Sequence, residues 1–162
     1  LYEPIKIIGF LNLHPAFLPY NKGWHTPSWA IYDGSKYGAT LHFMSEDLDS
    51  GDIIHQREII INADDTADSL YKRVKNLEVL VFKEAFPRIL DGSFEKIKQS
   101  SVGTSHFKND LDSIKKLDLN SKRPVIDVIT QLRALTTNDI NEASYFEENG
   151  NRYRVQINIH KE

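Results

Sequence analysis

The chain has 162 residues, with 20 Lys and Arg against 23 Asp and Glu, so its formal net charge is −3. This length fits one domain with or without a small appendage, and no apolar run approaches the ~20 residues of a membrane span, so we expect a soluble, cytoplasmic protein. Zero Cys excludes disulfides, thiolate metal sites and thiol nucleophiles, and a pI of about 6.1 argues against a broad nucleic-acid or membrane-binding surface.

Three apolar segments in the first part of the chain predict strands. Residues 5–13 form a buried strand in this interpretation, because the apolar run there is nearly continuous: Ile7, Ile8, Phe10, Leu11 and Leu13. Residues 37–45 and 52–61 predict a second and a third strand, separated by an acidic, turn-rich loop at 46–51.

Two helices are predicted beside these strands. Thr26 at the N-cap and Pro27 at the first helical position predict a short helix that Asp33-Gly34 closes. Asp65-Thr66 caps a predicted long helix, and Pro87 bends or ends it. Apolar residues recur at helical spacing on one face of this helix: Leu70, Val74, Leu77, Val81 and Ala85. Strands followed by a covering helix predict an α/β fold with a largely buried sheet.

The rest of the chain predicts a linker and a small C-terminal subdomain. Residues 94–123 are polar and carry one short helix around 111–117. Asn149-Gly150 predicts a hairpin turn after a helix that follows Pro124. That helix has Val125, Val128, Ile129, Leu132 and Leu135 as its apolar stripe, and the returning hairpin strand alternates Tyr153, Val155, Ile157 and Ile159 with polar residues. We expect a catalytic core at 1–93, the linker at 94–123 and the subdomain at 124–162.

Asn12 and His14 stand at the end of the first predicted strand and are two residues apart, so they project from the same face. An amide can stabilise a developing oxyanion while an imidazole handles a proton, a pair that suits acyl transfer. Asp49, in the acidic loop, could hydrogen-bond His14 and fix its tautomer. The plain alternatives are a strand-end cap and an exposed β-turn.

The segment at 17–25 combines a rigid Pro, a flexible Gly, a Lys and three aromatic residues. Lys22 could neutralise a phosphate, and Tyr20 or Trp24 could stack on a base or sugar. The candidate substrate-binding residues are Tyr20, Asn21, Lys22 and Trp24, followed by Arg133 and Tyr145. The alternatives are a surface loop with buried aromatic anchors and, for Arg133, a surface charge that lies over its own helix.

The stretch NLHPAFLPYNKG, followed by YGATLHFMSEDLDSGDII, resembles the catalytic core of the folate-dependent formyltransferases. That family covers glycinamide ribonucleotide, methionyl-tRNA and sugar-nucleotide N-formyltransferases. The resemblance implies that Asn12, His14 and Asp49 are catalytic and that His42 has at most a supporting role. It also implies the C-terminal part of a Rossmann-like domain, formyltetrahydrofolate as formyl donor and no metal.

Within this family, the PYNKG loop and the tail LRALTTND…EASYFEENGNRYRVQI are most similar to enzymes that act on nucleotide-linked amino-dideoxy sugars. The resemblance implies dTDP-4-amino-4,6-dideoxyglucose as the first candidate acceptor, in O-antigen or other surface polysaccharide synthesis. The terminal hairpin exposes a strand edge, so we expect a homodimer, with no nucleic-acid or membrane partner.

The sequence departs from the family because only eleven residues precede Asn12, where members carry a Rossmann-like segment. We therefore expect a truncated or cleaved piece that folds poorly or binds folate weakly alone. Three alternatives remain: a methionyl-tRNA formyltransferase, disfavoured by the −3 charge; a non-catalytic nucleotide-sugar-binding module or remnant; and a metal hydrolase using His14, His42 and Asp49, disfavoured by the lack of a compact ligand pattern.

Overall fold

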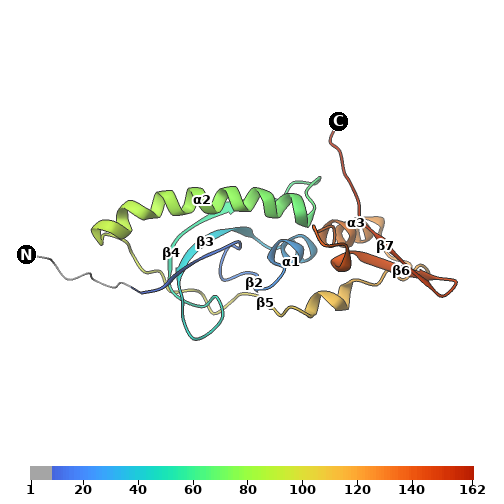
Figure 1. Cartoon of the computed structure of the whole chain (residues 1–162), viewed down its shortest axis with the longest axis horizontal. Helices are drawn as coiled ribbons and strands as arrows, with labels where there is room; N and C mark the ends of the chain where they lie inside the picture. Colours follow the sequence, from blue (N-terminus) through green and yellow to red (C-terminus); the bar gives the residue numbers. More distant parts are fainter. Residues whose placement is uncertain (1–8) are drawn as a thin grey trace, which may run out of the picture.

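The computed structural model describes residues 9–162, and its centre is an antiparallel sheet covered by one long helix (Figure 1). The sheet has the order β1-β3-β4, formed by β1 (Leu11–His14), β3 (Tyr37–Phe43) and β4 (Ile53–Ile59). All seven residues of the central strand β3 are buried. The second and third predicted strands are thus present, each slightly shorter than the apolar pattern suggested.

The first predicted strand is shorter than expected. The part at residues 5–8 lies outside the described residues, and β1 begins only at Leu11. Phe10, which we expected in the core, is 79% exposed, although its carbonyl still accepts a hydrogen bond from Met44 N at 2.8 Å. Within β1, Asn12 is paired with His42 of β3, so two of the candidate side chains stand opposite each other.

Helix α2 (Ala67–Asp91) lies across one face of the sheet (Figure 1). It begins at a capping box, in which Thr66 and Ser69 each accept a hydrogen bond from the other's backbone N–H, as the predicted N-cap requires. The prediction that Pro87 bends or ends this helix was wrong about its end, because α2 continues to Asp91. Pro87 lies on the exposed side of the helix, where water can satisfy the carbonyl that loses its partner.

Helix α1 (Thr26–Asp33) forms where the Thr-Pro signal predicted it and ends at Gly34, whose φ of 65° is accessible to glycine without strain. The N-cap is His25 rather than Thr26. Thr26 Oγ1 instead donates a hydrogen bond of 2.6 Å to Pro15 O, which ties the start of the helix to the end of β1.

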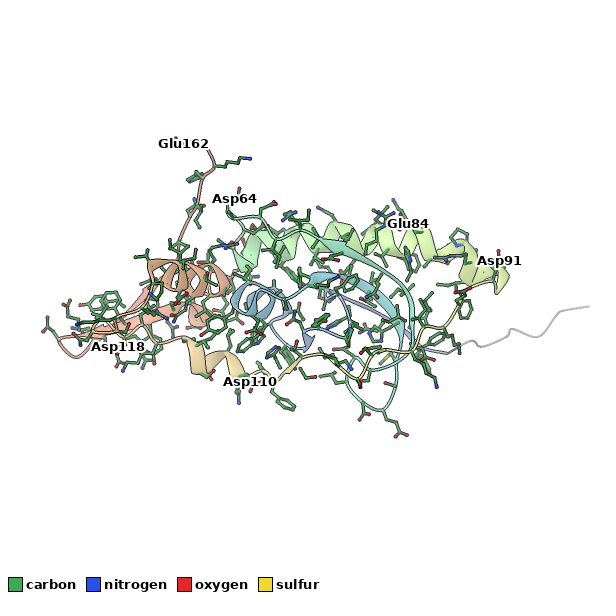
Figure 2. The ribbon with its side chains drawn as sticks, turned by 180° about the vertical axis from the view of Figure 1, so that it is seen from behind. Asp64, Glu84, Asp91, Asp110, Asp118 and Glu162 are labelled. Carbon is green, nitrogen blue, oxygen red and sulfur yellow. The ribbon has the colours of Figure 1, made fainter. Side chains whose placement is uncertain are left out.

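The predicted linker at 94–123 is packed against the core and runs along the side of the sheet opposite α2 (Figures 1 and 2). It contributes β5 (Ser105–His106), which pairs in parallel with β2 (Lys22–Gly23), and a short 3₁₀ helix, η1 (Asp110–Ile114), near the predicted helical turn. The His106 ring stacks on Trp29 of α1, with centroids 4.1 Å apart.

The C-terminal segment contains α3 (Val125–Ala134), a 3₁₀ turn η2 (Ile140–Glu142) and the predicted hairpin of β6 (Ser144–Glu148) and β7 (Asn151–Val155). The hairpin strand ends at Val155, before the predicted Ile157 and Ile159, because the chain leaves the ladder and Ile157 N donates to Thr136 Oγ1.

The apolar stripe predicted for α3 is only partly buried. Leu135 is fully buried and Val128 and Leu132 are half-buried, whereas Val125 and Ile129 are 73% and 36% exposed. The buried residues within the helix itself are Gln131 and Ala134. Gln131 is buried because its amide donates to Ile114 O, at 2.6 Å, in the segment beside α3. No helix within residues 9–162 is long and apolar enough to cross a membrane.

The capping box makes a stability prediction. Replacing Thr66 by Ala removes the side-chain acceptor for Ser69 N, and we expect a loss of about 1 kcal/mol in the free energy of unfolding. Urea denaturation measures it, with Ser101→Ala, an exposed serine, as the control. A Thr66→Ala protein as stable as the control would show that the cap contributes nothing.

Candidate active site

Asn12, His14 and Asp49 meet at one edge of the sheet. Asn12 and His14 come from β1, and Asp49 comes from the loop between β3 and β4. Asn12 Nδ2 donates to Asp49 Oδ1 at 3.3 Å, and His14 Nδ1 lies 3.6 Å from Asp49 Oδ2. The side chains of His14 and Asp49 are only 7% and 8% exposed, so the pair interacts with little screening by water. The predicted convergence of amide, imidazole and carboxylate is therefore present.

His42 fixes the orientation of Asn12. Its Nδ1 faces the carbonyl of Phe43 at 2.8 Å, and because a carbonyl only accepts, this nitrogen carries the proton. The remaining ring nitrogen, Nε2, then accepts from Asn12 Nδ2 at 3.3 Å. Burial lowers the pKa of His42, which keeps the ring neutral and able to accept. This geometry fits a packed strand histidine, and a supporting role of His42 in catalysis stays a prediction.

The loop that carries Asp49 is held from three sides. Asp49 has a φ of 50°, and Gly23 N donates to its Oδ2 at 2.9 Å. Gln99, from the linker, donates to the carbonyls of Asp49 and Gly51, both at 2.8 Å. A side chain at Gly51 would place its Cβ 1.8 Å from Phe43 O, so only glycine fits there. The orientation of the Asp49 carboxylate is thus determined by the fixed backbone of its loop and not by side-chain packing alone.

His14 is placed between two acceptors. Its Nε2 donates to Asn21 O at 3.3 Å, while Nδ1 faces the Asp49 carboxylate. An imidazole with an acceptor at each nitrogen can carry a second proton, because both N–H groups then have a partner. Chemically, this arrangement suits a group that takes up or passes on a proton during acyl transfer.

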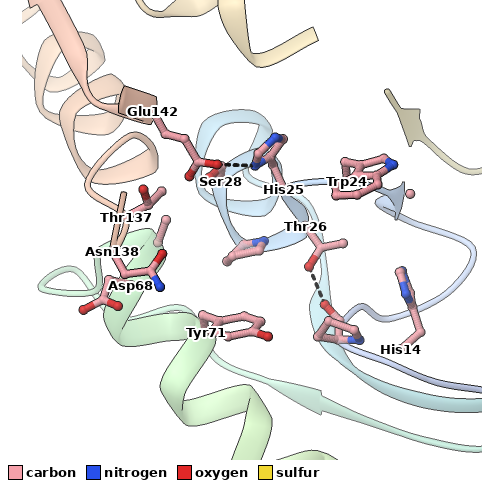
Figure 3. A pocket seen from close by; sticks show the side chains of 14 residues that line it. His14, Trp24, His25, Thr26, Ser28, Asp68, Tyr71, Thr137, Asn138 and Glu142 are labelled. Carbon is pink, nitrogen blue, oxygen red and sulfur yellow. Dashed lines mark hydrogen bonds and ion pairs between the residues drawn. The ribbon is translucent and has the colours of Figure 1, made fainter. Parts of the chain in front are cut away.

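A cavity of about 390 Å³ opens beside His14 (Figure 3). Its walls come from the start of α1, the start of α2 and the segment that leads into η2. The lining includes His14, Trp24, His25, Asp68, Tyr71 and Glu142. His25 Nδ1 and Glu142 Oε1 are 3.4 Å apart across one side of it. The volume lies within the range of small-molecule sites, which is roughly 300–1,000 Å³.

The loop residues that we expected to bind substrate lie in different places. Trp24 lines the cavity and is 51% exposed, so its ring is free to contact a ligand. Lys22 Nζ donates to Ser50 Oγ at 2.9 Å and thereby stabilises the loop next to Asp49. Tyr20 is partly buried and is not among the residues that line the cavity.

Asn21, which was expected to contact substrate, makes its hydrogen bonds within the chain. Its side chain is fully buried, and Asn21 Nδ2 donates to Ser35 Oγ at 2.9 Å. Its backbone N donates to Thr104 Oγ1 at 2.8 Å, which joins the loop to the linker. Asn21 thus contacts His14 through its carbonyl, and its expected contact with substrate stays a prediction.

Arg133 and Tyr145 are also outside the cavity. The Arg133 guanidinium donates to the carbonyls of Asp65 and Asn62, at 2.8 and 2.6 Å, and holds the loop before α2. Tyr145 lies in the hairpin under the Arg152 guanidinium, 4.1 Å from ring centroid to Cζ. Both residues make contacts within their own chain, and their expected role in substrate binding stays a prediction.

Four residues of this region were missed by sequence reasoning: Asp68, Tyr71, Glu142 and Gln99. Asp68 lies in the first turn of a helix, where an acidic residue is expected because it interacts favourably with the helix dipole, so its position alone gave no functional signal. Glu142 was treated only as part of the tail pattern, and Gln99 lies in a polar segment with no motif around it. Within residues 9–162, no group of His, Asp or Glu side chains has the arrangement of a metal-ligand set.

Comparison with known proteins shows which family the chain belongs to. Residues 6–86 match the Formyl transferase family, and residues 110–161 match the N-formyltransferase dimerization C-terminal domain. The chain belongs to the formyl transferase family. The expected fold class, the C-terminal part of a formyltransferase-type α/β domain with a small hairpin-ending subdomain, is confirmed by structural neighbours of this family.

Relatives within the formyl transferase family include sugar-modifying members. The chain is 35% identical to a dTDP-4-amino-4,6-dideoxyglucose formyltransferase of Mycobacterium bovis over 94% of its own length and 65% of the relative's. A 4-N formyltransferase from Francisella tularensis has a TM-score of 0.87 and 33% identity, over 93% of this chain and 62% of that one. An N-formyltransferase from Helicobacter canadensis has a TM-score of 0.74 and 27% identity, over 86% of this chain and 51% of that one. The chain thus spans less than two thirds of these relatives' lengths.

The lowered pKa of His42 predicts how stability depends on pH. Unfolded, the imidazole has its ordinary pKa of 6.5; folded, burial keeps the pKa lower, so below pH 6.5 the unfolded state binds more protons. The stabilisation is complete above pH 6.5 and is lost as the pH falls towards the folded pKa. We expect urea unfolding between pH 7.5 and 5 to show this loss, and His42→Gln to make it smaller.

The half-buried His106, whose pKa is also lowered by desolvation, contributes with the same sign and remains in the His42→Gln protein. The exposed His160 provides the control, because His160→Gln should keep the full pH dependence. Equal slopes of unfolding free energy against pH for wild type and His42→Gln would contradict the assignment of a neutral, buried His42.

Proposed function

We propose that this chain carries the catalytic groups of a folate-dependent N-formyltransferase. The reaction moves a formyl group from formyltetrahydrofolate to the amine of a nucleotide-linked amino-dideoxy sugar. The single observation that carries the proposal is the convergence of Asn12, His14 and Asp49 around one point, beside a cavity of ligand size, in a chain of the formyl transferase family. Membership of the family supports the chemistry, and the geometry supports the residues.

The chain's residues supply an oxyanion site and a proton route. As the amine nitrogen bonds to the formyl carbon, Asn12 and His14 stabilise the negative charge on the formyl oxygen. Asn12 Nδ2 contacts His42 and Asp49 in the present structure, so it exchanges one of these partners for the formyl oxygen. The amine proton passes to the His14–Asp49 pair and then to the folate nitrogen, as the bond from that nitrogen to the formyl carbon breaks.

The identity of the substrates rests on relatives. The Mycobacterium bovis relative is named for dTDP-4-amino-4,6-dideoxyglucose, and the Helicobacter canadensis structure contains folinic acid and dTDP-3-aminofucose. We propose dTDP-4-amino-4,6-dideoxyglucose as the acceptor and 10-formyltetrahydrofolate as the donor. Incubation of the natural full-length protein with the donor and a panel of nucleotide-linked amino sugars tests this, with mass spectrometry to detect the added formyl group.

A methionyl-tRNA formyltransferase is the second candidate, because one from Staphylococcus aureus is 30% identical over 80% of this chain. The net charge of −3 disfavours it, since binding tRNA depends on neutralising phosphates with Lys and Arg. Formylation of methionyl-tRNA, with no formylated sugar nucleotide in the panel, would replace the sugar proposal with this one.

We also propose a homodimer formed through the C-terminal segment. The match to a dimerization domain at residues 110–161 supports it, and so do the exposed apolar side chains of Val125 and Ile126 on α3. Light scattering of the natural protein should give twice the mass of one chain. A mass equal to one chain at micromolar concentration would contradict this assembly.

The catalytic assignment predicts large losses of rate. We expect Asn12→Ala, His14→Ala and Asp49→Ala each to lower kcat for formyl transfer by about a hundredfold or more, because each removes a group from the site of charge development. Asp49→Asn keeps the side-chain volume and an acceptor for Gly23 N, so it should lose rate with little change in melting temperature.

Asn120→Ala serves as the control and should keep the wild-type rate. Asn120 is exposed, is remote in the sequence from Asn12, His14 and Asp49, and makes no side-chain hydrogen bond among residues 9–162. Rates within a few fold of wild type in all three alanine variants would overturn the assignment. Circular dichroism on each variant distinguishes a lost catalytic group from a lost fold.

A further inference from the structure

Among residues 9–162, the side chains that line the cavity beside His14 include acidic and aromatic ones but no Lys or Arg. Asp68 and Glu142 contribute carboxylates, and Trp24 and Tyr71 contribute aromatic rings (Figure 3). Carboxylates repel a diphosphate placed among them, whereas they accept hydrogen bonds from hydroxyl groups. Aromatic rings offer flat apolar surfaces to C–H groups, such as those of a deoxy sugar. The chemistry of the cavity therefore fits the sugar ring of a nucleotide sugar and not its phosphates.

Glu142 has unused hydrogen-bonding capacity. Among residues 9–162, the only group within ion-pair distance of its carboxylate is His25 Nδ1, at 3.4 Å from Oε1; the Glu142 side chain lines the cavity and is 25% exposed. A carboxylate offers about four lone-pair positions, so one contact leaves most of them free. Asp68 differs, because its Oδ2 is already paired with Lys72 Nζ at 2.6 Å. Of the two carboxylates, Glu142 is the one more available to a ligand.

The backbone around Glu142 is fixed before any ligand arrives. Asp139 caps η2 by accepting from Asn141 N at 2.8 Å, and Arg154 of β7 donates to the carbonyls of Asn141 and Ala143, which flank Glu142. At the other end of this segment, Asp68 N donates to Thr136 O at 3.0 Å and joins it to α2. The backbone that carries Glu142 therefore loses little conformational freedom when a ligand binds.

We infer, on the basis of the proposed function, that Glu142 is a specificity-determining residue that accepts a hydrogen bond from a ring hydroxyl of the acceptor amino sugar. The reacting amine is then at the His14 side of the cavity and the nucleotide lies outside it. The segment that matches a dimerization domain thus has a second task, which is to complete the acceptor site of its own chain.

The test compares Glu142→Ala and Glu142→Gln with wild type in the natural full-length protein. Calorimetry measures binding of dTDP-4-amino-4,6-dideoxyglucose and of dTDP without a sugar. We expect Glu142→Ala to weaken binding of the sugar nucleotide and to raise its KM about tenfold, the effect of losing one hydrogen bond to a charged group. Glu142→Gln keeps an acceptor oxygen and should recover part of the loss. Affinity for dTDP alone, and KM for the folate donor, should not change.

Glu148→Gln is the matched control, because it removes the same charge from the exposed end of β6 in the same hairpin segment, and it should behave as wild type. Unchanged sugar-nucleotide affinity in Glu142→Ala would overturn the inference, and so would an equal loss for dTDP and for the sugar nucleotide. If wild type formylates none of the sugars, the proposed function itself fails, and this result is distinct from an active wild type whose Glu142 variants bind normally.

Discussion

The carboxylate of Asp49 is the contact on which the site depends. One of its oxygens accepts from the amide of Asn12, and the other accepts from Gly23 N and faces the imidazole of His14. These partners come from the edge strand β1 and from the short strand β2, so a single side chain joins segments that the sheet alone does not connect. Because the carboxylate is almost fully buried, these contacts are strong enough to define the distances between Asn12, His14 and Asp49.

The sequence predicted the order of strands and helices well, because periodic apolar residues and turn signals are local properties. Residues 37–43 show this clearly: the apolar run gave a buried strand, and the structure buries every residue of it. The sequence-based prediction failed where contacts between distant segments determine which residues are buried. The apolar stripe of α3 was expected to be buried, yet Val125 is exposed. The polar Gln131 is buried instead, because its side-chain amide donates to a backbone carbonyl of the neighbouring segment.

The same distinction between local sequence signals and tertiary contacts applies to the site. Asn12, His14 and Asp49 could be placed together because a strand fixes the first two and a recognisable loop carries the third. The cavity could not be foreseen, since its walls come from residues far apart in the chain, such as His25 and Glu142. Arg133 looked like a ligand-binding charge, but its partners are two backbone carbonyls, and nothing in the local sequence reveals such a pairing.

The position of Gln99 has a consequence for anyone who wishes to exchange C-terminal modules between relatives. This side chain reaches from the connecting segment to the carbonyls of Asp49 and Gly51, and Ser105 and His106 extend the contact by pairing with β2. A chimera joined near residue 94 would replace Gln99, whose amide holds the loop that carries Asp49. A junction placed after His106 would leave that support with its own core, so it is the sounder boundary for recombination.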